Sequence, residues 1–125
     1  MANNKSVKKM TATASYVRDT DASSGTGAKA VADTMSIPIG ATVTACITVP
    51  SVSSNSSGNG ETIAITVGGV TVSAAHNQAA MAAGNVVTDV TGGVTTTNAN
   101  IGITVGGENP SHGAMDIIIE YYLLD

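Results

Sequence analysis

The residues of this 125-residue chain whose types could do chemistry are few, and their spacing is unhelpful for it. His76 and His112 are the candidate bases or metal ligands, and Cys46 is the candidate nucleophile. A metal site would need ligand pairs at short spacing, such as His-x-His or Cys-x-x-Cys, and the sequence contains neither. We therefore predict no catalytic residue, no metal site and no cofactor, and we expect that the protein is not an enzyme.

Both histidines are expected to be surface or turn residues rather than bases. Residues 74–83 are rich in alanine and follow Ser73, a suitable N-cap, so we predict one short helix there that carries His76. His112 lies in a turn that begins at Glu108. A Ser-His-Asp triad is a spatial arrangement that a sequence cannot exclude, but no Gly-x-Ser-x-Gly nucleophile motif is present.

One glycine-rich segment, Ser23-Ser-Gly-Thr-Gly-Ala-Lys29, is superficially similar to a phosphate-binding loop. It lacks the Gly-x-x-x-x-Gly-Lys-Ser/Thr spacing, and no strand-helix-strand unit surrounds it. We therefore predict a loop with no ligand.

Cys46 is the only cysteine, so the chain has no internal disulfide, which is typical of a protein made in a reducing cytosol. It lies in the alternating run Ala41-Thr-Val-Thr-Ala-Cys-Ile-Thr-Val49, on the face that carries the threonines. No histidine or basic residue is near it in sequence, so we expect a small packing residue.

The charges are separated along the chain. All five basic residues lie within the first 29 positions, and the remainder holds seven carboxylates and no Lys or Arg. Residues 1–9 are polar and aperiodic, so we predict an extended N-terminal arm joined to a single body, residues 10–125. Lys5, Lys8 and Lys9 are the candidate contacts of this arm with a partner. A merely solubilising N-terminus is the alternative.

Two classes of partner are not expected. Nucleic-acid binding needs a basic face with stacking aromatics, and an acidic body without Phe or Trp offers neither. A membrane span needs about 20 apolar residues, whereas the apolar stretch Ile117–Ile119 is ended by Glu120.

The composition predicts an all-β fold before any pattern is considered. Val, Ile and Thr make up about a third of the chain, and these residues suit the pleated surface of a sheet. Short runs of period two recur between Gly, Pro, Ser and Asn clusters, which is typical of a single-domain β-sandwich or jelly roll. One feature is a repeat: Ile63-Ala-Ile-Thr-Val-Gly-Gly69 returns as Ile101-Gly-Ile-Thr-Val-Gly-Gly107, either as equivalent strands in two halves of a sandwich or by coincidence.

The closing strand, Met115 to Leu124, carries large residues on both faces, so it should be central or lie at a subunit contact. Ile118, Tyr122 and Leu124 are the candidate subunit contacts on its second face. A core of Val, Ile and Ala without Phe or Trp buries little area per residue, which favours burial between subunits. We therefore expect a homo-oligomer, with a trimer as the favoured state.

The chain resembles the capsid decoration (cement) proteins of tailed bacteriophages. The resemblance is carried by the arm at 1–9, the run from Ala41 to Val49, the two Ile-Thr-Val-Gly-Gly turns and the strand Met115-Asp-Ile-Ile-Ile-Glu-Tyr-Tyr122. It implies a jelly-roll or related β-fold, often trimeric, that is made in the host cytoplasm and sits on the capsid surface of the virion. There it would bind the major capsid protein and stabilise the capsid by bridging neighbouring subunits.

Other readings of the same sequence stay open. A head fibre, neck or tail protein would share this composition, and so would a receptor-binding or sugar-binding module. Sugar-binding modules usually display exposed Trp or Tyr, and this chain has no Trp and three Tyr.

Overall fold

The computed structural model of the chain describes residues 7–95 and 99–124, and it confirms the all-β prediction. The strands are β1 (Val7–Val17), β2 (Gly27–Ala30), β3 (Asp33–Thr34), β4 (Ser36–Ile37), β5 (Thr42–Asn55), β6 (Thr62–Val67), β7 (Val70–His76), β8 (Val87–Thr95), β9 (Ala99–Gly106) and β10 (His112–Leu124). A four-residue helix, α1 (Arg18–Asp21), follows β1.

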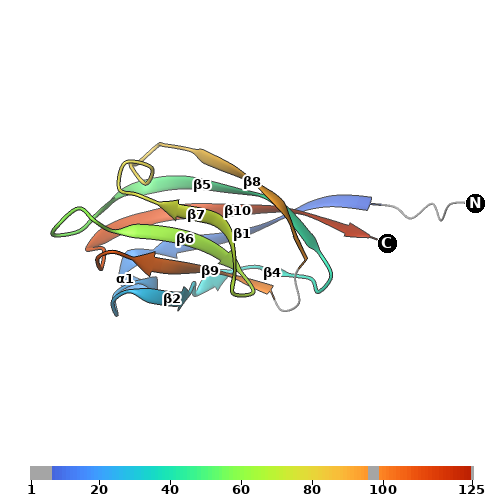
Figure 1. Cartoon of the computed structure of the whole chain (residues 1–125), viewed down its shortest axis with the longest axis horizontal. Helices are drawn as coiled ribbons and strands as arrows, with labels where there is room; N and C mark the ends of the chain where they lie inside the picture. The colour runs from blue at the N-terminus through green and yellow to red at the C-terminus, as the bar shows by residue number, and fades with distance from the viewer. Residues whose placement is uncertain (1–6, 96–98, 125) are drawn as a thin grey trace, which may run out of the picture.

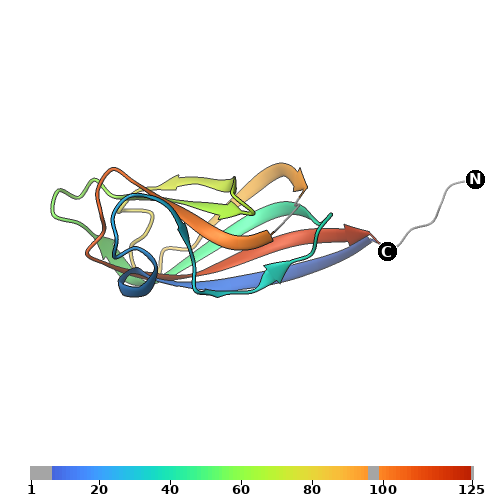
Figure 2. The same cartoon turned by 90° about the horizontal axis from the view of Figure 1, so that it is seen from below.

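Two antiparallel sheets face each other as a sandwich (Figures 1 and 2). Sheet A has the order β3-β1-β10-β5-β8, and sheet B has the order β2-β9-β6-β7 with β4 paired to β9. The start of β1 and the end of β10 lie together at one tip, because Val7 is the register partner of Leu124. The edge strands β7 and β8 of the two sheets lie against each other along one side of the sandwich.

The closing strand β10 is central in sheet A, between β1 and β5, as its two apolar faces predicted. One face, Met115, Ile117, Ile119 and Tyr121, is at most 4% exposed and packs in the core. The isoleucines of β6 and β9 meet this face from sheet B. The core therefore consists of aliphatic side chains with Tyr16 and Tyr121, because the chain has no larger apolar residues to offer.

Strand β5 departs from the regular alternation of the run from Ala41 to Val49. It continues beyond that run, through Pro50 to Asn55. It also carries one extra residue, Thr44, relative to β10, because Val43 and Ala45 are the register partners of the adjacent residues Tyr121 and Glu120. After an extra residue the alternation changes face, so Cys46 and Thr48 point into the core while Ile47 is only half-buried.

The predicted helix at residues 74–83 is wrong. Residues up to His76 extend β7, whose pairing with β6 includes Ile63 opposite His76. Residues 77–84 then form turns, held by the Asn77 side chain, which accepts the Ala80 N–H at 2.9 Å, and anchored by the buried Met81. Alanine favours a helix by only a few tenths of a kcal/mol per residue, roughly, so sheet pairing and the burial of Val72, Ser73 and His76 prevail.

The repeated sequence forms neighbouring strands of one sheet. β6 and β9 pair antiparallel in sheet B, and the equivalent residues Ile65 and Ile103 are register partners. The interpretation as strands in two separate halves of the sandwich is therefore wrong.

The last three residues of the predicted arm lie in a strand. Val7, Lys8 and Lys9 belong to β1 and pair with the end of β10. Residues 1–6, including Lys5, are outside the described part of the chain.

Candidate functional site

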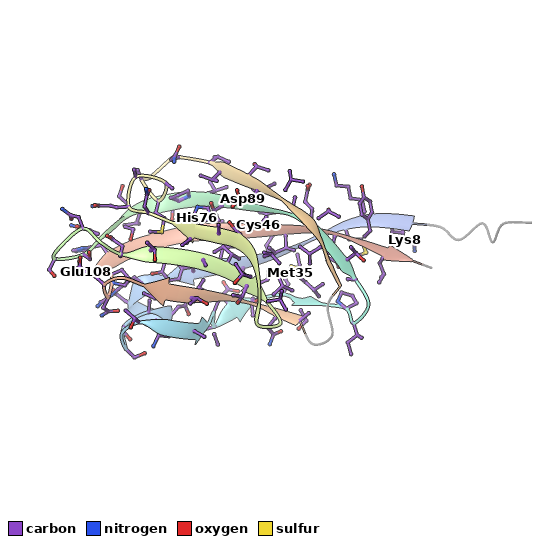
Figure 3. The ribbon with its side chains drawn as sticks, viewed as in Figure 1. Lys8, Met35, Cys46, His76, Asp89 and Glu108 are labelled. Carbon is purple, nitrogen blue, oxygen red and sulfur yellow. The ribbon has the colours of Figure 1, made fainter. Side chains whose placement is uncertain are left out.

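The one histidine–carboxylate pair among the described residues lies between the two sheets, on side chains that the sequence scattered (Figure 3). Ser73 and His76 come from β7 and Asp89 from β8. Ser73 Oγ lies 2.6 Å from His76 Nε2 and donates its hydrogen to Asp89 Oδ2, which is itself 3.7 Å from Nε2. Cys46 of β5 is the register partner of Asp89 and completes the group. We call these four residues the seam cluster.

Burial dominates the electrostatics of the seam cluster. His76 is 5% exposed, so it is a buried residue and not the surface residue that was predicted. Desolvation lowers the pKa of His76, and the nearby Asp89 carboxylate opposes that shift. Burial, with a further contribution from Asp89, raises the pKa of the Cys46 thiol to about 12.

The geometry of the seam cluster is not that of a nucleophilic triad. In a triad, serine and aspartate occupy opposite ring nitrogens, so that the aspartate orients the base toward the serine. Here both Ser73 and Asp89 approach the same nitrogen, Nε2. Ser73 is 2% exposed and His76 is 5% exposed, so neither side chain is open to a substrate. The cluster joins strands rather than presenting a nucleophile to a substrate.

The other candidate base is His112. His112 is exposed at the start of β10, directly after the turn in which the sequence placed it, and its Nδ1 lies 3.1 Å from Ser111 Oγ. Within residues 7–95 and 99–124, no group of three His, Cys, Asp or Glu side chains could hold a metal ion. In the same ranges no helix is long and apolar enough to cross a membrane.

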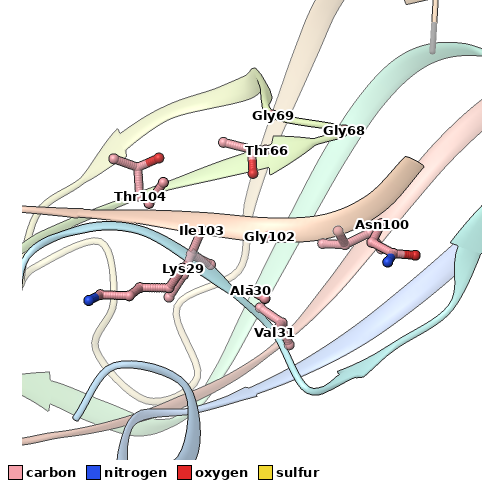
Figure 4. Close-up of a pocket in the computed structure, with 12 residues that line it drawn as sticks. Lys29, Ala30, Val31, Thr66, Gly68, Gly69, Asn100, Gly102, Ile103 and Thr104 are labelled. Carbon is pink, nitrogen blue, oxygen red and sulfur yellow. The ribbon is translucent and has the colours of Figure 1, made fainter. Parts of the chain in front are cut away.

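A groove of about 340 Å³ crosses the outer face of sheet B (Figure 4). Its floor is Gly102, where a Cβ would lie 2.9 Å from Thr66 Oγ1 and 3.1 Å from the Lys29 carbonyl. The ionisable side chain on its rim is Lys29, whose ammonium donates to Ser24 Oγ at 2.9 Å. The groove therefore pairs no acid with a base.

Two glutamates organise the loop at one end of the sandwich. Glu61 is 1% exposed and accepts hydrogen bonds from Ser54 Oγ at 3.0 Å and Ser56 Oγ at 3.1 Å. Glu108 accepts the backbone N–H groups of Gly58 and Gly60, each at 2.8 Å. The segment from Ser54 to Gly60, rich in serine and glycine, is thus held in place by two carboxylates, which composition alone could not reveal.

The outer face of sheet A carries exposed apolar side chains, which lie among polar and charged ones such as Asp116 and Glu120. Ile118 of β10 is the register partner of Ile47 on β5, and both point outward. Val90 of β8, a neighbour on the same face, is 83% exposed. At one end of this face lies Tyr122, which is 40% exposed, and at the other end lies Val52, which is 51% exposed. Such a surface is characteristic of proteins that bind another macromolecule.

The outer face of sheet B differs sharply in chemistry. Its outward register partners on the described strands are small residues: Thr62 with Gly106, Ala64 with Thr104, Thr66 with Gly102 and Ser36 with Asn100. None of these side chains is charged or larger than threonine or asparagine. The two faces of the sandwich are therefore distinguishable, and sheet A carries the candidate binding surface.

The structure brings several of the sequence-derived contact residues onto one surface. Ile118 and Tyr122 lie on the outer face of sheet A, and Lys9 beside Tyr122 forms an ion pair with Glu120 at 3.6 Å. Lys8 is exposed on β1 at the same tip. Leu124 belongs to β10, but its side chain lies outside the described residues, as does Lys5.

Comparison with known proteins gives a likeness of structure only. No protein-family model matches the chain, and no curated sequence matches it. A chain of the cyanophage Pam1 capsid asymmetric unit matches with a TM-score of 0.60 and 16% identity, over 98% of this chain and 89% of that one. A chain of the acidic stable capsid structure of Helicobacter pylori bacteriophage KHP30 matches with a TM-score of 0.58 and 14% identity, over 95% and 93%. The protein has the fold of chains found in two phage capsids.

Proposed function

We propose that this protein is a structural component of a phage virion, a decoration protein that binds the outer surface of the capsid. The observation that carries the proposal is the shared fold, which extends over nearly the whole of this chain and of the two capsid chains. The protein would be made in the host cytoplasm, bind the major capsid protein and stabilise the particle by bridging neighbouring subunits. It would act without catalysis or a cofactor.

The outer face of sheet A supplies the contacts in this proposal. Ile47, Ile118 and Val90 offer adjacent aliphatic area, and burial of such area contributes roughly 25 cal/mol per Å². Tyr122 and Leu124 extend the contact along β10 to the tip where the arm begins. There Lys5, Lys8 and Lys9 would meet acidic groups of a partner, so attachment should weaken with rising salt.

Homo-oligomerisation, with a trimer as the favoured state, fits the same surface. The exposed apolar side chains of sheet A, such as Val90 and Tyr122, can pack against another copy. An oligomer engages several capsid subunits at once, and multivalency turns weak individual contacts into firm attachment. A protein that binds the assembled capsid but not its separated subunits then stabilises the assembled state by mass action.

The test compares capsids assembled with and without this protein. Decorated capsids should rupture at a higher temperature than bare ones. Ile118→Asp, on the central strand of sheet A, should reduce attachment strongly, because burying an unpaired carboxylate in the contact is costly. Thr104→Asp is the matched control. Thr104 is also half-buried, but it lies on β9, a central strand of the other sheet, sheet B.

Both variants must first show the far-UV spectrum and melting behaviour of the natural protein. If bare and decorated capsids rupture at the same temperature, the stabilising role is excluded. If, in addition, particles that lack the protein fail to attach to the host, a receptor-binding role replaces the stabilising role. Light scattering measures the mass of the purified protein and of the protein released from capsids. A folded monomer of 12.3 kDa in both samples would contradict the proposed oligomer.

A further inference from the structure

The seam cluster joins the two sheets at the side of the sandwich where no backbone pairing does. β7 and β8 are the end strands of sheets B and A, and within the described residues they belong to no common ladder. Their side chains nevertheless meet, through Ser73 and His76 on one strand and Asp89 on the other. On this side of the sandwich, polar side chains rather than a row of backbone hydrogen bonds therefore connect β7 with β8.

The hydrogen positions in the cluster follow from its donors and acceptors. The single hydroxyl hydrogen of Ser73 goes to Asp89, an acceptor-only carboxylate. Ser73 Oγ must then accept from His76, which places the ring hydrogen of a neutral imidazole on Nε2. The chain Nε2–H to Oγ–H to Oδ2 is complete in that tautomer. The second ring nitrogen, Nδ1, is where a further proton would bind.

A proton on Nδ1 would be poorly accommodated. The His76 side chain is 4% exposed, whereas the Asp89 side chain is 39% exposed and keeps much of its own hydration. The groups around the imidazole are Ser73 on β7, Asp89 on β8 and the thiol of Cys46 on β5, which interacts with both Asp89 and Ser73. Asp89 is the one charged group that acts on His76, and its attraction is smaller than the desolvation of the buried ring.

We propose that Ser73, His76 and Asp89 form an acid-sensitive clasp between the two sheets, which holds β7 against β8 while His76 is neutral and loosens when His76 is protonated. The proposal does not rest on the proposed function, because the clasp belongs to the isolated chain. Its effect would be to make one edge of the sandwich, with the exposed Val90 on β8, responsive to acid.

The direction of the pH effect follows from linkage. The unfolded chain has a histidine of ordinary pKa, about 6.5, so it binds a proton more readily than the folded chain does. The stabilisation from the clasp is therefore fully present above that pH. It is lost as pH falls through 6.5 and down to the lower pKa of the folded state.

The test follows thermal unfolding and hydrogen exchange of the purified protein between about pH 7.5 and about pH 5, the range in which histidine titrates. His76→Gln keeps an amide donor for Ser73 Oγ but cannot titrate there, so its melting temperature should depend less on pH than that of the natural protein. His112→Gln is the matched control, because it removes the exposed histidine, and it should retain the full pH dependence. Exchange corrected for intrinsic rates should rise on acidification in β7 and β8 more than in β1 and β10.

The proposal is overturned if His76→Gln loses as much stability on acidification as the natural protein, or if exchange rises equally in all four strands. If His76→Gln does not fold, NMR titration of His76 in the natural protein decides. His76 should titrate below the ordinary histidine pKa of about 6.5, because its ring is buried. A His76 pKa at or above that ordinary value would overturn the clasp.

Discussion

Cys46 and Asp89 lie opposite each other on β5 and β8, and both side chains point toward sheet B. This relationship depends on the extra residue of β5 between Val43 and Ala45, which are the register partners of the adjacent residues Tyr121 and Glu120 of β10. Without it, strict alternation would place Cys46 on the opposite side from Val43, which is in the core. The seam cluster thus exists because one strand departs from regular geometry.

The thiol of Cys46 should be inert in the folded protein. Its pKa, raised to about 12, leaves about one molecule in ten thousand as thiolate near pH 8. Reaction with a disulfide reagent such as DTNB should therefore be very slow under native conditions and rapid in concentrated guanidinium. Stoichiometric labelling of the native protein at the rate of a free thiol would contradict the burial of Cys46.

Replacing Glu61 should destabilise the fold although it lies far from any proposed contact. Glu61→Ala removes the acceptor of two buried hydroxyls, Ser54 and Ser56, at roughly 1–3 kcal/mol for each group left unsatisfied. Glu120→Ala is the control, since an exposed ion pair such as that with Lys9 contributes about 0–1 kcal/mol. Urea unfolding of both variants measures the difference. Equal midpoints would show that the Glu61 hydrogen bonds contribute nothing.

Two glycines with similar backbone angles should respond differently to substitution. Gly107 (φ 72°) and Gly40 (φ 85°) both lie in the left-handed region, where a side chain costs roughly 1–2 kcal/mol. A Cβ at Gly107 would in addition collide with the carbonyl oxygen of Gly60, whereas one at Gly40 would meet nothing within 4 Å. Gly107→Ala should therefore melt well below Gly40→Ala. Similar melting temperatures would mean that the loop beside Gly60 moves freely.

Removing the hydroxyl of Tyr16 should not weaken the protein. Tyr16 is 1% exposed, and its hydroxyl has no hydrogen-bond partner in the part of the chain that the structure describes. Burial, with the Asp21 carboxylate nearby, raises its pKa to about 12. Tyr16→Phe should leave the free energy of unfolding unchanged or raise it by about 1 kcal/mol, since no bond is lost. A clear loss of stability in denaturant titration would reveal a bond to that hydroxyl.

The seam cluster shows where sequence reasoning reaches its limit. His76 was placed on a predicted helix because Ser73 and the alanines after it have helix-like local preferences. The pairing of Ile63 with His76, which decides that β7 is a strand, joins residues that no local window connects. No local pattern in the sequence marks Asp89 as a site residue, since its partners are 13 and 16 residues away and on another sheet.

What the sequence determined by itself is the class of fold and the two faces of its strands. β-Branched composition and period-two alternation act locally, so the strands at Met10–Tyr16, Ile63–Val67 and Met115–Leu124 and the outward position of Ile118 could be predicted. Tertiary structure alone decided the reversal of faces along β5, the strand in place of a helix before His76 and the meeting of Ser73, His76 and Asp89. Each of these depends on which strand lies beside which, and that is set by burial over the whole core rather than by the preferences of neighbouring residues.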